Sequence, residues 1–388
     1  MAIVAINALN SNQGGGKSIR DSYLRLLNTS LLSHKYFIIV PSHMGLEFVN
    51  NPNIEVLVLP FYWSNTLLAP LIYRFLLGRV LQRICADVVL NMGDLIVHTS
   101  AKQLYIFDWP YALDVHPKVW SDMNLLDRIN RRFKLYLIKR DFNKPDIVIA
   151  QTNFIKNRLE VLYCLENVRV INNAVTLNSP DDDEQSNFSL SDGIKLFCPS
   201  VYYPHKNLEI LIDLAELIKA DESDYVIVTT IAPYSVSSRR LLRSIHDRGL
   251  QDIIINIGPV PLNSMCSLYK KCDALLMPTL LESFSIVYLE AMHYGLPVFT
   301  SDMWFARAVC GNAAQYFEPL DAVNILHSIN AVMPHLTKKR HLVQLGNQRL
   351  ASFPTWEQNF VTYQQYIHQL LASDVLMGPA RSLRFSKK

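Results

Sequence analysis

The chain has 388 residues, of which 50% are apolar and 18% are charged, and its formal net charge is +3. This length allows two or three domains with large buried cores, and so mild a charge does not indicate nucleic acid as a partner. The N-terminus lacks the charged start and long apolar core of a secretory signal, and no uncharged apolar stretch is long enough to cross a bilayer.

The first part of the chain alternates between apolar runs and helix-like stretches. The expected strands are AIVAINAL, KYFIIVP, IEVLVLP, ADVVLNMG, QLYIFD, PDIVIAQT and VRVINNAV. These runs are nearly continuous rather than alternating, which is typical of parallel strands covered by helices on both faces. The sequence therefore predicts an α/β domain over residues 1–175.

A polar, acidic linker is expected at residues 176–191, and the alternation then restarts. The strands IKLFCPS, YVIVTTI, DIIINIGP, DALLMPT, LPVFTSD and AAQYFEP predict a second α/β domain over residues 192–352. A C-terminal helix over 353–375 and a basic tail over 376–388 follow. Ligands of such sheets bind beyond the carboxyl ends of the strands, so residues just after each strand are the candidates for a site.

A glycine cluster, NQGGGKS, lies between the first expected strand and the first expected helix. It fits neither the triphosphatase loop, because Ser11 replaces the first glycine, nor the dinucleotide fingerprint, because Ile19 replaces the last. A flexible turn is the preferred interpretation of the cluster alone. The alternative is that its glycines let an anionic ligand approach a helix start, with Lys17 as a secondary candidate. These glycines are Gly14, Gly15 and Gly16.

Two carboxylates mark the most informative stretch of the second domain, LLESFSIVYLEAMHYGLP. Glu282 lies in a loop after an expected strand, and a helix predicted to start at residues 283–285 carries Glu290. The helix start offers N–H groups to an anion, and a carboxylate is a natural acceptor for a vicinal diol such as that of ribose. The alternative is a helix-start charge for Glu282 and a solvated helix residue for Glu290.

A basic residue precedes the first expected helix of the second domain, in CPSVYYPHKNLEIL. The helix is predicted to begin near Lys206. A lysine there is unfavourable for the helix dipole unless a bound diphosphate reverses the sign. A surface lysine that points to water is the alternative.

Together these motifs resemble the retaining glycosyltransferases of family 4, which have the GT-B fold. The E-x7-E motif is present as Glu282 and Glu290, the basic residue as Lys206, and the glycine-rich loop as residues 14–16; AAQYFEPLD also resembles the family's sequence after the motif. The resemblance covers both domains and is stronger in the second. It implies two Rossmann-like parallel-sheet domains that face each other across a cleft, the first for the acceptor and the second for a nucleotide sugar. It also implies that the C-terminal helix crosses back to the first domain.

The resemblance further implies a role for each matching residue. Glu290 would bind the ribose hydroxyls, Glu282 would contact the donor sugar near the reacting carbon, and Lys206 would neutralise the leaving diphosphate. Other donor contacts are expected from Ser283, Phe284, Ser285, Ile286, Gly258, Pro259 and His205. The reaction would retain the anomeric configuration and need no cofactor or metal, because lysine and helix dipoles carry the leaving-group charge. A UDP- or GDP-linked sugar is the implied donor, and a glycan or lipid-linked glycan of a cell-surface polysaccharide (O-antigen or capsule) is the implied acceptor.

Several positions depart from the family pattern. The arginine that many relatives carry before the lysine is absent, and His205 or a tyrosine is the candidate substitute. Phe107 replaces the histidine of a His-Asp pair, which leaves Asp108 as the candidate catalytic group on the acceptor side, or alternatively as a turn cap. Arg307, in a loop that often carries a glutamate, has no assigned role. The acidic run DDDE lies in the linker and is interpreted as a solvated charge run rather than a metal site.

A basic amphipathic stretch covers residues 127–141. As a helix it would carry Arg128, Arg131, Arg132 and Lys139 on one side and Ile129, Phe133, Tyr136 and Leu137 on another. Such a helix can lie on an anionic bilayer, but an ordinary helix with its apolar face on the sheet is the preferred interpretation. Six cysteines without a C-x-x-C pair are typical of reduced thiols. We therefore expect a cytoplasmic protein, with peripheral association at the inner face of the cell membrane left open.

Other functions remain alternatives. A non-hydrolysing nucleotide-sugar epimerase has the same architecture, although the extended E-x7-E context disfavours it. A catalytically silent nucleotide-sugar-binding subunit would fit the missing arginine and histidine. A nicotinamide dehydrogenase is the weakest alternative, because neither glycine run fits its fingerprint.

Overall fold

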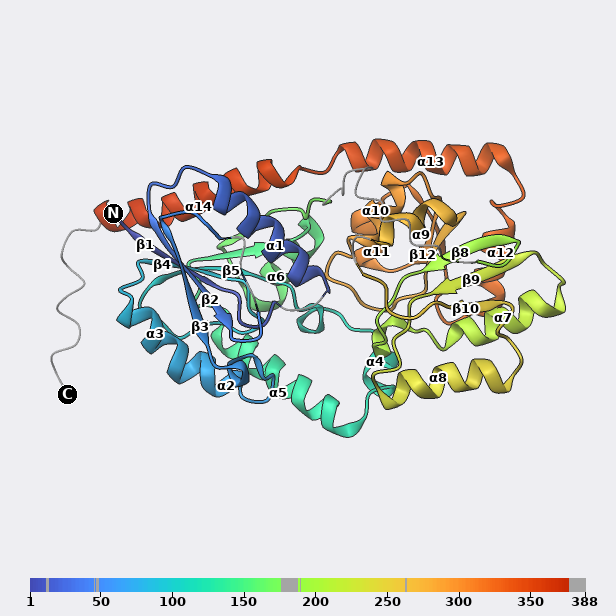
Figure 1. Cartoon of the computed structure of the whole chain (residues 1–388), viewed down its shortest axis with the longest axis horizontal. Coiled ribbons are helices and arrows are strands. Elements are labelled where there is room, and N and C mark those ends of the chain that lie inside the picture. The colour runs from blue at the N-terminus through green and yellow to red at the C-terminus, as the bar shows by residue number, and fades with distance from the viewer. Residues whose placement is uncertain are drawn as a thin grey trace. The chain divides into compact units, whose positions relative to one another are not determined.

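A computed structural model of the chain describes residues 1–11, 14–44, 46, 49–175, 188, 190–261 and 264–376. Most of the predicted linker, including the DDDE run, and nearly all of the predicted basic tail lie outside the described residues. The chain divides into two compact units, and each is built on its own parallel sheet (Figure 1).

The first unit comprises Met1–Leu113, Leu125–Ala174 and the chain from Pro354 onward. Its seven strands lie in the order β3-β2-β1-β4-β5-β6-β7, and every neighbouring pair is parallel. The strands are β1 (Ile3–Asn7), β2 (Lys35–Pro41), β3 (Ile54–Leu59), β4 (Val88–Asn91), β5 (Lys102–Ile106), β6 (Ile147–Ala150) and β7 (Val168–Val170). The strand order changes direction between β1 and β4, which is the switch point where such sheets bind ligands.

Helices cover both faces of this sheet. They are α1 (Gly14–Thr29), α2 (Ala69–Leu71), a π-helical turn (Ile72–Leu76), α3 (Leu77–Arg83), α5 (Leu125–Asp141), α6 (Asn153–Tyr163) and α14 (Trp356–Leu376). The central strands β4 and β6 are buried along their whole length, as their unbroken apolar sequences require.

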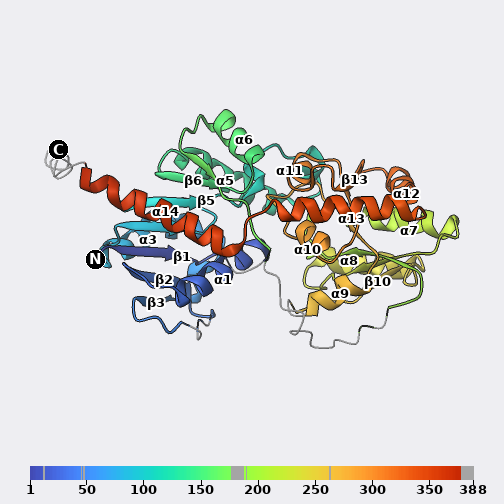
Figure 2. The same cartoon turned by 90° about the horizontal axis from the view of Figure 1, so that it is seen from above.

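The last helix, α14, packs on this first unit. Its side chains Trp356, Tyr363, Ile367 and Leu370 join the core formed with β1 and β4. Asn359 adds a hydrogen bond to the backbone oxygen of Asn172 at 2.8 Å. Figures 1 and 2 both show α14 beside α1, and the two helices are in contact. The expected return of the C-terminal helix is therefore confirmed.

The second unit comprises Asp114–Asn124 and Val175–Phe353. Its six strands lie in the order β10-β9-β8-β11-β12-β13, again all parallel. The strands are β8 (Ile194–Cys198), β9 (Tyr225–Thr229), β10 (Ile254–Asn256), β11 (Ala274–Met277), β12 (Val298–Ser301) and β13 (Ala314–Phe317). All thirteen predicted strands are thus present, and the two predicted Rossmann-like parallel-sheet domains are confirmed.

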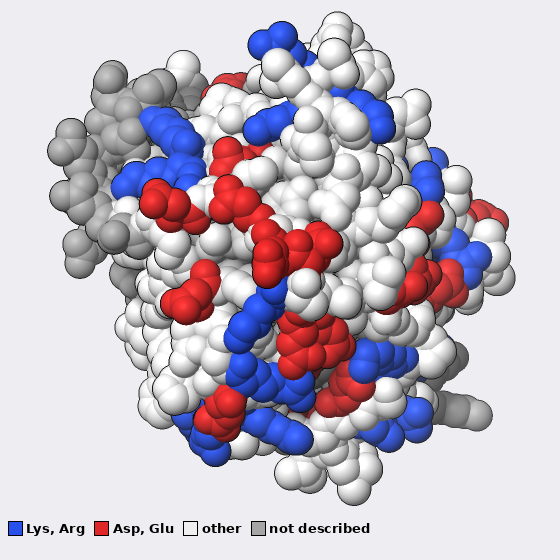
Figure 3. Space-filling view, turned by 90° about the vertical axis from the view of Figure 1, so that its right-hand side faces the viewer, with Lys and Arg blue, Asp and Glu red and all other residues white. Residues whose placement is uncertain are grey.

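Two cores lie on opposite faces of the second sheet. Alternate residues of β8 point to opposite faces, so Leu196 and Cys198 join one core while Phe197 joins the other. The covering helices are α4 (Pro117–Ser121), α7 (Ile210–Ala220), α8 (Val236–Asp247), α9 (Met265–Lys271), α10 (Val287–His293), α11 (Trp304–Cys310), α12 (Ala322–Asn330) and α13 (Leu336–Ala351). Figure 3 shows Lys and Arg interspersed with Asp and Glu on the face that lies at the right of Figure 1. This face therefore carries no field of a single sign.

Candidate active site

Lys206 and Glu282 form an ion pair in the second unit. Lys206 ends a 3₁₀ turn that follows β8, and Glu282 lies in the loop after β11. Because β8 and β11 are neighbouring parallel strands, their carboxyl ends bring these distant residues to one edge of the sheet. Only 15% of the lysine side chain and 13% of the glutamate side chain are exposed. The pair is therefore a fixed, partly desolvated cation and anion at the edge where ligands bind.

The predicted helix start at Lys206 is wrong, because α7 begins at Ile210. Lys206 is followed by Asn207 in a left-handed conformation (φ 53°), which asparagine tolerates better than most residues. The lysine charge is compensated by Glu282 rather than opposed by a helix dipole. The helix-dipole argument for a bound diphosphate therefore does not hold, and the interpretation as a surface lysine in water is also wrong.

Backbone and amide contacts fix the turn that carries Lys206. Asn207 is only 2% exposed, and its Nδ2 donates to the backbone oxygens of Pro278 at 3.1 Å and Pro319 at 2.7 Å. The backbone oxygen of His205 accepts from the Leu280 amide at 2.7 Å. The turn is thereby tied to the ends of β11 and β13. Sequence reasoning missed Asn207, whose one signal was an asparagine in a turn position.

Glu290 lies on α10, and its Oε2 accepts a hydrogen bond from the Tyr269 hydroxyl at 2.7 Å. Tyr269 is buried, and its ring stacks on Tyr294 with 5.3 Å between centroids. Burial raises the pKa of Glu290, although the hydrogen bond from Tyr269 opposes the shift. Burial and the nearby carboxyl also keep the pKa of Tyr269 well above its usual value, so the phenol stays a donor. The interpretation of Glu290 as a solvated residue is therefore wrong, and one of its two oxygens is already engaged.

The loop between the two glutamates differs from the prediction. The helix α10 begins at Val287 rather than at residues 283–285. Ser285 has a φ of 62°, which is unusual for a residue with a side chain and is often found at functional sites. The Phe284 side chain is buried against Phe353, with the two rings edge to face at 5.7 Å. Only the backbone of Phe284 is left for a ligand, whereas Ser283, Ser285 and Ile286 are partly exposed.

The remaining donor-side candidates lie in separate loops. Gly258 and Pro259 follow β10, and Gly258 has a left-handed φ of 75° with open space where a Cβ would lie. The His205 ring stacks on Tyr203 at 5.3 Å between centroids. Arg307 forms an ion pair with Asp302, with Nη2 at 2.7 Å from Oδ2. Glu290 contacts Tyr269 rather than the Lys206–Glu282 pair. Of the predicted site residues on the donor side, Lys206 and Glu282 are therefore in direct contact with each other, and Glu290 is held separately.

In the first unit, Asp108 follows β5 and lies beside the glycine-rich start of α1. Its Oδ1 accepts a hydrogen bond from Nε2 of the buried Gln151, after β6, at 2.9 Å. A Cβ added to Gly16 would lie 3.7 Å from Asp108 Oδ2, whereas one added to Gly15 would meet nothing within 4 Å. The structure therefore brings two predicted features together, the Gly14–Gly16 segment that opens α1 and Asp108, at the carboxyl edge of the sheet.

Phe107 is fully buried, and its ring lies 5.8 Å from that of Phe142. The position where relatives carry a histidine is therefore part of the hydrophobic core here. Asp108 has no imidazole immediately before it to share its chemistry, so any acid–base role on this side falls to the carboxylate.

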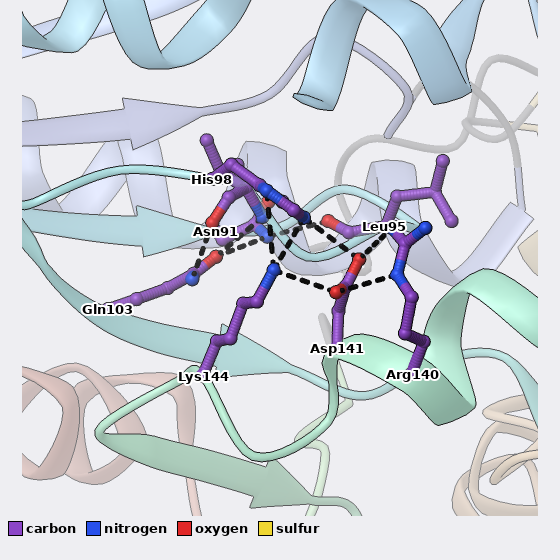
Figure 4. A network of polar contacts seen from close by, with 8 residues as sticks. Asn91, Leu95, His98, Gln103, Arg140, Asp141 and Lys144 are labelled. Carbon is purple, nitrogen blue, oxygen red and sulfur yellow. Dashed lines mark hydrogen bonds and ion pairs between the residues drawn. The ribbon is translucent and has the colours of Figure 1, made fainter. Parts of the chain in front are cut away.

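A buried polar network fixes the ends of β1, β4 and β5. Asn7 Nδ2 donates to Asn91 Oδ1 at 2.8 Å, and Asn91 Nδ2 donates to Gln103 Oε1 at 2.9 Å. Figure 4 shows the Asn91–Gln103 part of this network together with the ion cluster of Asp141. Burial opposes ionisation of Asp141, yet hydrogen bonds from Arg140, His98 and Lys144 hold its pKa well below the usual range. The side chains of both clusters form hydrogen bonds with one another and hold the loops in place.

Two features are absent from the part of the chain that the structure describes. Among those residues no helix combines the length and the apolar character that a membrane span requires. No group of three or more His, Cys, Asp or Glu side chains is arranged to hold a metal ion in the same described ranges.

Comparison with known proteins agrees with this arrangement. Residues 180–342 match the family model of glycosyl transferases group 1. The chain is 27% identical over 213 residues to the O-antigen chain mannosyltransferase RfbU of Salmonella typhimurium, an alignment that covers 54% of this chain and 56% of that protein. The chain thus matches about half the length of this curated relative.

Solved structures share the fold of the whole chain. A sucrose-phosphate synthase from Thermosynechococcus elongatus has a TM-score of 0.72 at 14% identity, over 96% of this chain and 100% of that one. Anabaena Alr3699/HepE in complex with UDP and glucose has a TM-score of 0.68 at 17% identity, over 96% and 100% of the two chains. The family match and the shared fold confirm the resemblance to a glycosyltransferase with the GT-B fold.

Proposed function

We propose that the chain is a retaining glycosyltransferase of family 4 that moves a sugar from a nucleoside-diphosphate donor to a glycan or lipid-linked glycan acceptor in cell-surface polysaccharide synthesis. The observation that carries the proposal is the Lys206–Glu282 ion pair at the carboxyl edge of the second sheet. It lies inside the segment that matches the group 1 glycosyltransferase model. The polysaccharide assignment draws support from the similarity to an O-antigen mannosyltransferase.

The ion pair suggests how the nucleotide-sugar donor binds. Without donor, Glu282 compensates the charge of Lys206 in a partly desolvated place. A diphosphate that enters offers the lysine a stronger anionic partner, which frees Glu282 to contact the sugar. Lys206 then stabilises the charge that develops on the phosphate as the bond to the anomeric carbon breaks. In this scheme the lysine neutralises the leaving-group charge, and no metal is assigned a step.

Glu290 is proposed to bind the ribose hydroxyls. Tyr269 holds one carboxylate oxygen, so the other oxygen is the acceptor that remains open. The buried ring of Tyr269, stacked on Tyr294, keeps the carboxylate in one orientation. A pre-oriented acceptor gains affinity because less freedom is lost when the nucleotide binds.

The acceptor is proposed to bind the first unit beside Asp108. The new bond joins an acceptor oxygen to the anomeric carbon, so the hydroxyl must lose its proton. A carboxylate can orient that hydroxyl and take up the proton. The glycine start of α1, next to Asp108, leaves room for a sugar to approach the backbone. A lipid-linked acceptor would place the enzyme at the inner face of the cell membrane.

A product assay tests the proposal. The full chain is first screened by thermal shift against UDP, GDP and their sugars, and the stabilising donor is then incubated with lipid-linked and free glycans. We expect a new glycosidic bond, with the donor's anomeric configuration by NMR, and release of the nucleoside diphosphate. An epimerised nucleotide sugar formed without acceptor would replace the proposal by the epimerase. Binding without turnover with any acceptor would assign the chain to the silent subunit, which the burial of Phe107 favours.

A further inference from the structure

The helix α5 turns its apolar stripe away from the protein. Ile129, Phe133 and Tyr136 follow one another at helical spacing, and they are 54%, 52% and 59% exposed. The preferred expectation that this face packs on the sheet is therefore wrong. A row of exposed apolar side chains on one helix face is a candidate docking surface.

Basic side chains anchor α5 to the unit instead. The Arg131 guanidinium lies 4.3 Å from the centre of the Tyr111 ring, and Lys134 lies 4.6 Å from that of Trp109. Lys134 also pairs with Asp94. These cation–π contacts and the ion pair hold the inner face of α5 against the rest of the unit. The helix therefore keeps Ile138 buried and Arg131 and Lys134 on aromatic rings, while Arg132, Lys139 and Arg140 are exposed together with the apolar stripe.

A second segment exposes apolar side chains in the same way. From Phe61 to Leu76 the exposed apolar residues are Phe61, Tyr62, Leu67, Leu68, Leu71, Phe75 and Leu76. Ile72 and Tyr73 are buried and hold the segment in place. It contains a turn of π-helix, a rare element that often marks functional sites. Residues 61–83 include no Asp or Glu, whereas Arg74, Arg79 and Arg83 are exposed.

Both segments are joined through His98. The His98 amide donates to the backbone oxygen of Tyr73 at 3.1 Å, and its Nε2 is hydrogen-bonded to Asp141, the last residue of α5, at 2.9 Å. A Cβ on Gly78 would lie 2.1 Å from the His98 backbone oxygen, so α3 also packs closely on this loop. Figure 4 shows the His98–Asp141 contact, and Figure 1 shows α2 and α5 along the same lower edge of the first unit. We call the exposed side chains of Phe61–Leu76 and α5 the apolar–basic surface.

We propose that the apolar–basic surface docks the protein on an anionic lipid bilayer. Charge complementarity selects this occupant over a second copy of the chain or another protein. The helix α5 carries six Lys and Arg against Asp127 and the buried Asp141, and the other segment adds arginines without any acid. Exposed aromatic and aliphatic side chains between basic ones are typical of segments that lie in the interface of anionic membranes. The choice of a bilayer also rests on the proposed function, since a lipid-linked acceptor is held in one.

Flotation of the full chain with vesicles tests the proposal. Vesicles of phosphatidylcholine alone are compared with vesicles that contain about one third phosphatidylglycerol, at low and high salt. We expect flotation with the anionic vesicles and at least a tenfold weaker binding to the neutral ones. The double variant Ile129→Ser, Phe133→Ser should lose tenfold or more of the binding to anionic vesicles. The variant Arg79→Gln, Arg132→Gln, Lys139→Gln should lose mainly the component that salt removes.

A matched control is Val161→Ser, Val361→Ser, which alters two exposed apolar residues of the same unit outside the surface and should bind as the wild type does. Equal binding to both lipids, or binding that Ile129→Ser, Phe133→Ser leaves intact, would overturn the proposal. Concentration-dependent self-association that the same variant abolishes, without vesicle binding, would assign the surface to a second copy. The thermal melting transition shows whether each variant is folded. The shift of this transition with nucleotide separates the two proposals, because flotation without any nucleotide effect would leave docking intact and remove the transferase.

Discussion

Each unit presents a carboxylate at the carboxyl edge of its parallel sheet, but the two carboxylates are held in different ways. Glu282 in the second unit is paired with a lysine. Asp108 in the first unit accepts from the amide of Gln151 and lies beside the glycine start of α1. An ion pair supplies a cation that a diphosphate can take over, whereas the amide hydrogen bond from Gln151 can hold the Asp108 carboxylate in position for an acceptor hydroxyl. The comparison suggests that the second unit handles the leaving-group charge and the first handles the acceptor.

The comparison predicts its largest effect for the variant Lys206→Ala. We expect kcat/KM to fall about 10³-fold, since the loss of one fixed donor to a developing charge costs 10²–10³ in rate and Glu282 is also left without its cation. Initial rates with the preferred donor measure the effect. Lys219→Ala serves as the control, because that lysine donates to the Gly249 backbone oxygen at an exposed helix end, and the rate of this variant should stay within twofold of the wild type. A milder effect for Lys206→Ala than for Lys17→Ala would transfer the phosphate role to the glycine-rich loop.

The second test is Asp108→Asn, which keeps the shape of the side chain and removes its charge. We expect transfer to slow about 10²-fold, the lower range for loss of a general base. Donor affinity should stay within twofold, because the donor site is assigned to the other unit. Steady-state rates and titration with the nucleoside diphosphate separate the two quantities. Loss of donor affinity would contradict the division between the units.

The third test compares the two glutamates of the motif. Glu290→Ala should weaken nucleotide binding by about 10-fold to 100-fold, since a hydrogen bond to a charged group contributes roughly 1.5–3 kcal/mol. Glu282→Ala should mainly lower kcat, because contacts near the reacting carbon strengthen in the transition state. Calorimetric titration and rates at saturating donor measure the split. Wild-type values for both variants would remove the site assignment.

The difference between the units also explains what the sequence could predict. The strands and the two α/β domains could be predicted because buried parallel strands leave unbroken apolar runs, whereas the GT-B fold was implied by the family resemblance. The E-x7-E motif could be recognised because both glutamates lie on one short segment, in the loop after a strand and on the helix that follows. Lys206 could be tied to Glu282 only through the family resemblance, since the adjacency of β8 and β11 appears in the fold alone.

Other features depend on contacts that no local pattern encodes. The amphipathic pattern of α5 gave two faces without indicating which one lies inward, and only the structure shows that Arg131 and Lys134 contact the rings of Tyr111 and Trp109. Tyr269 lies on a different helix from Glu290, 21 positions earlier, and nothing in its surroundings marks it as a partner. The replacement of histidine by Phe107 was visible, but its burial against Phe142 was not.

The smallest and most specific effect is expected for Tyr269→Phe, which removes only the hydroxyl that binds Glu290. Nucleotide affinity should fall about fivefold, in line with roughly 1 kcal/mol for a single hydrogen bond. The pH dependence gives the sharper readout. Donor binding uses the ionised carboxylate, so affinity falls as the pH drops through the pKa of Glu290, which burial already raises above its usual value. The hydroxyl of Tyr269 favours the ionised form, so its loss should raise this pKa further and move the acid limb of binding to higher pH.

Tyr225→Phe is the matched control, because the Tyr225 hydroxyl donates to Asn330 at 2.9 Å in the same unit and has no part in the proposed site. Its binding curve should follow the wild type at every pH. If Tyr269→Phe weakens binding equally at all pH values, Tyr269 acts only by packing, and the orientation of Glu290 does not depend on its hydroxyl. An acid limb that moves in this variant alone would tie the charge of Glu290 to nucleotide recognition, in the unit to which the comparison assigns it.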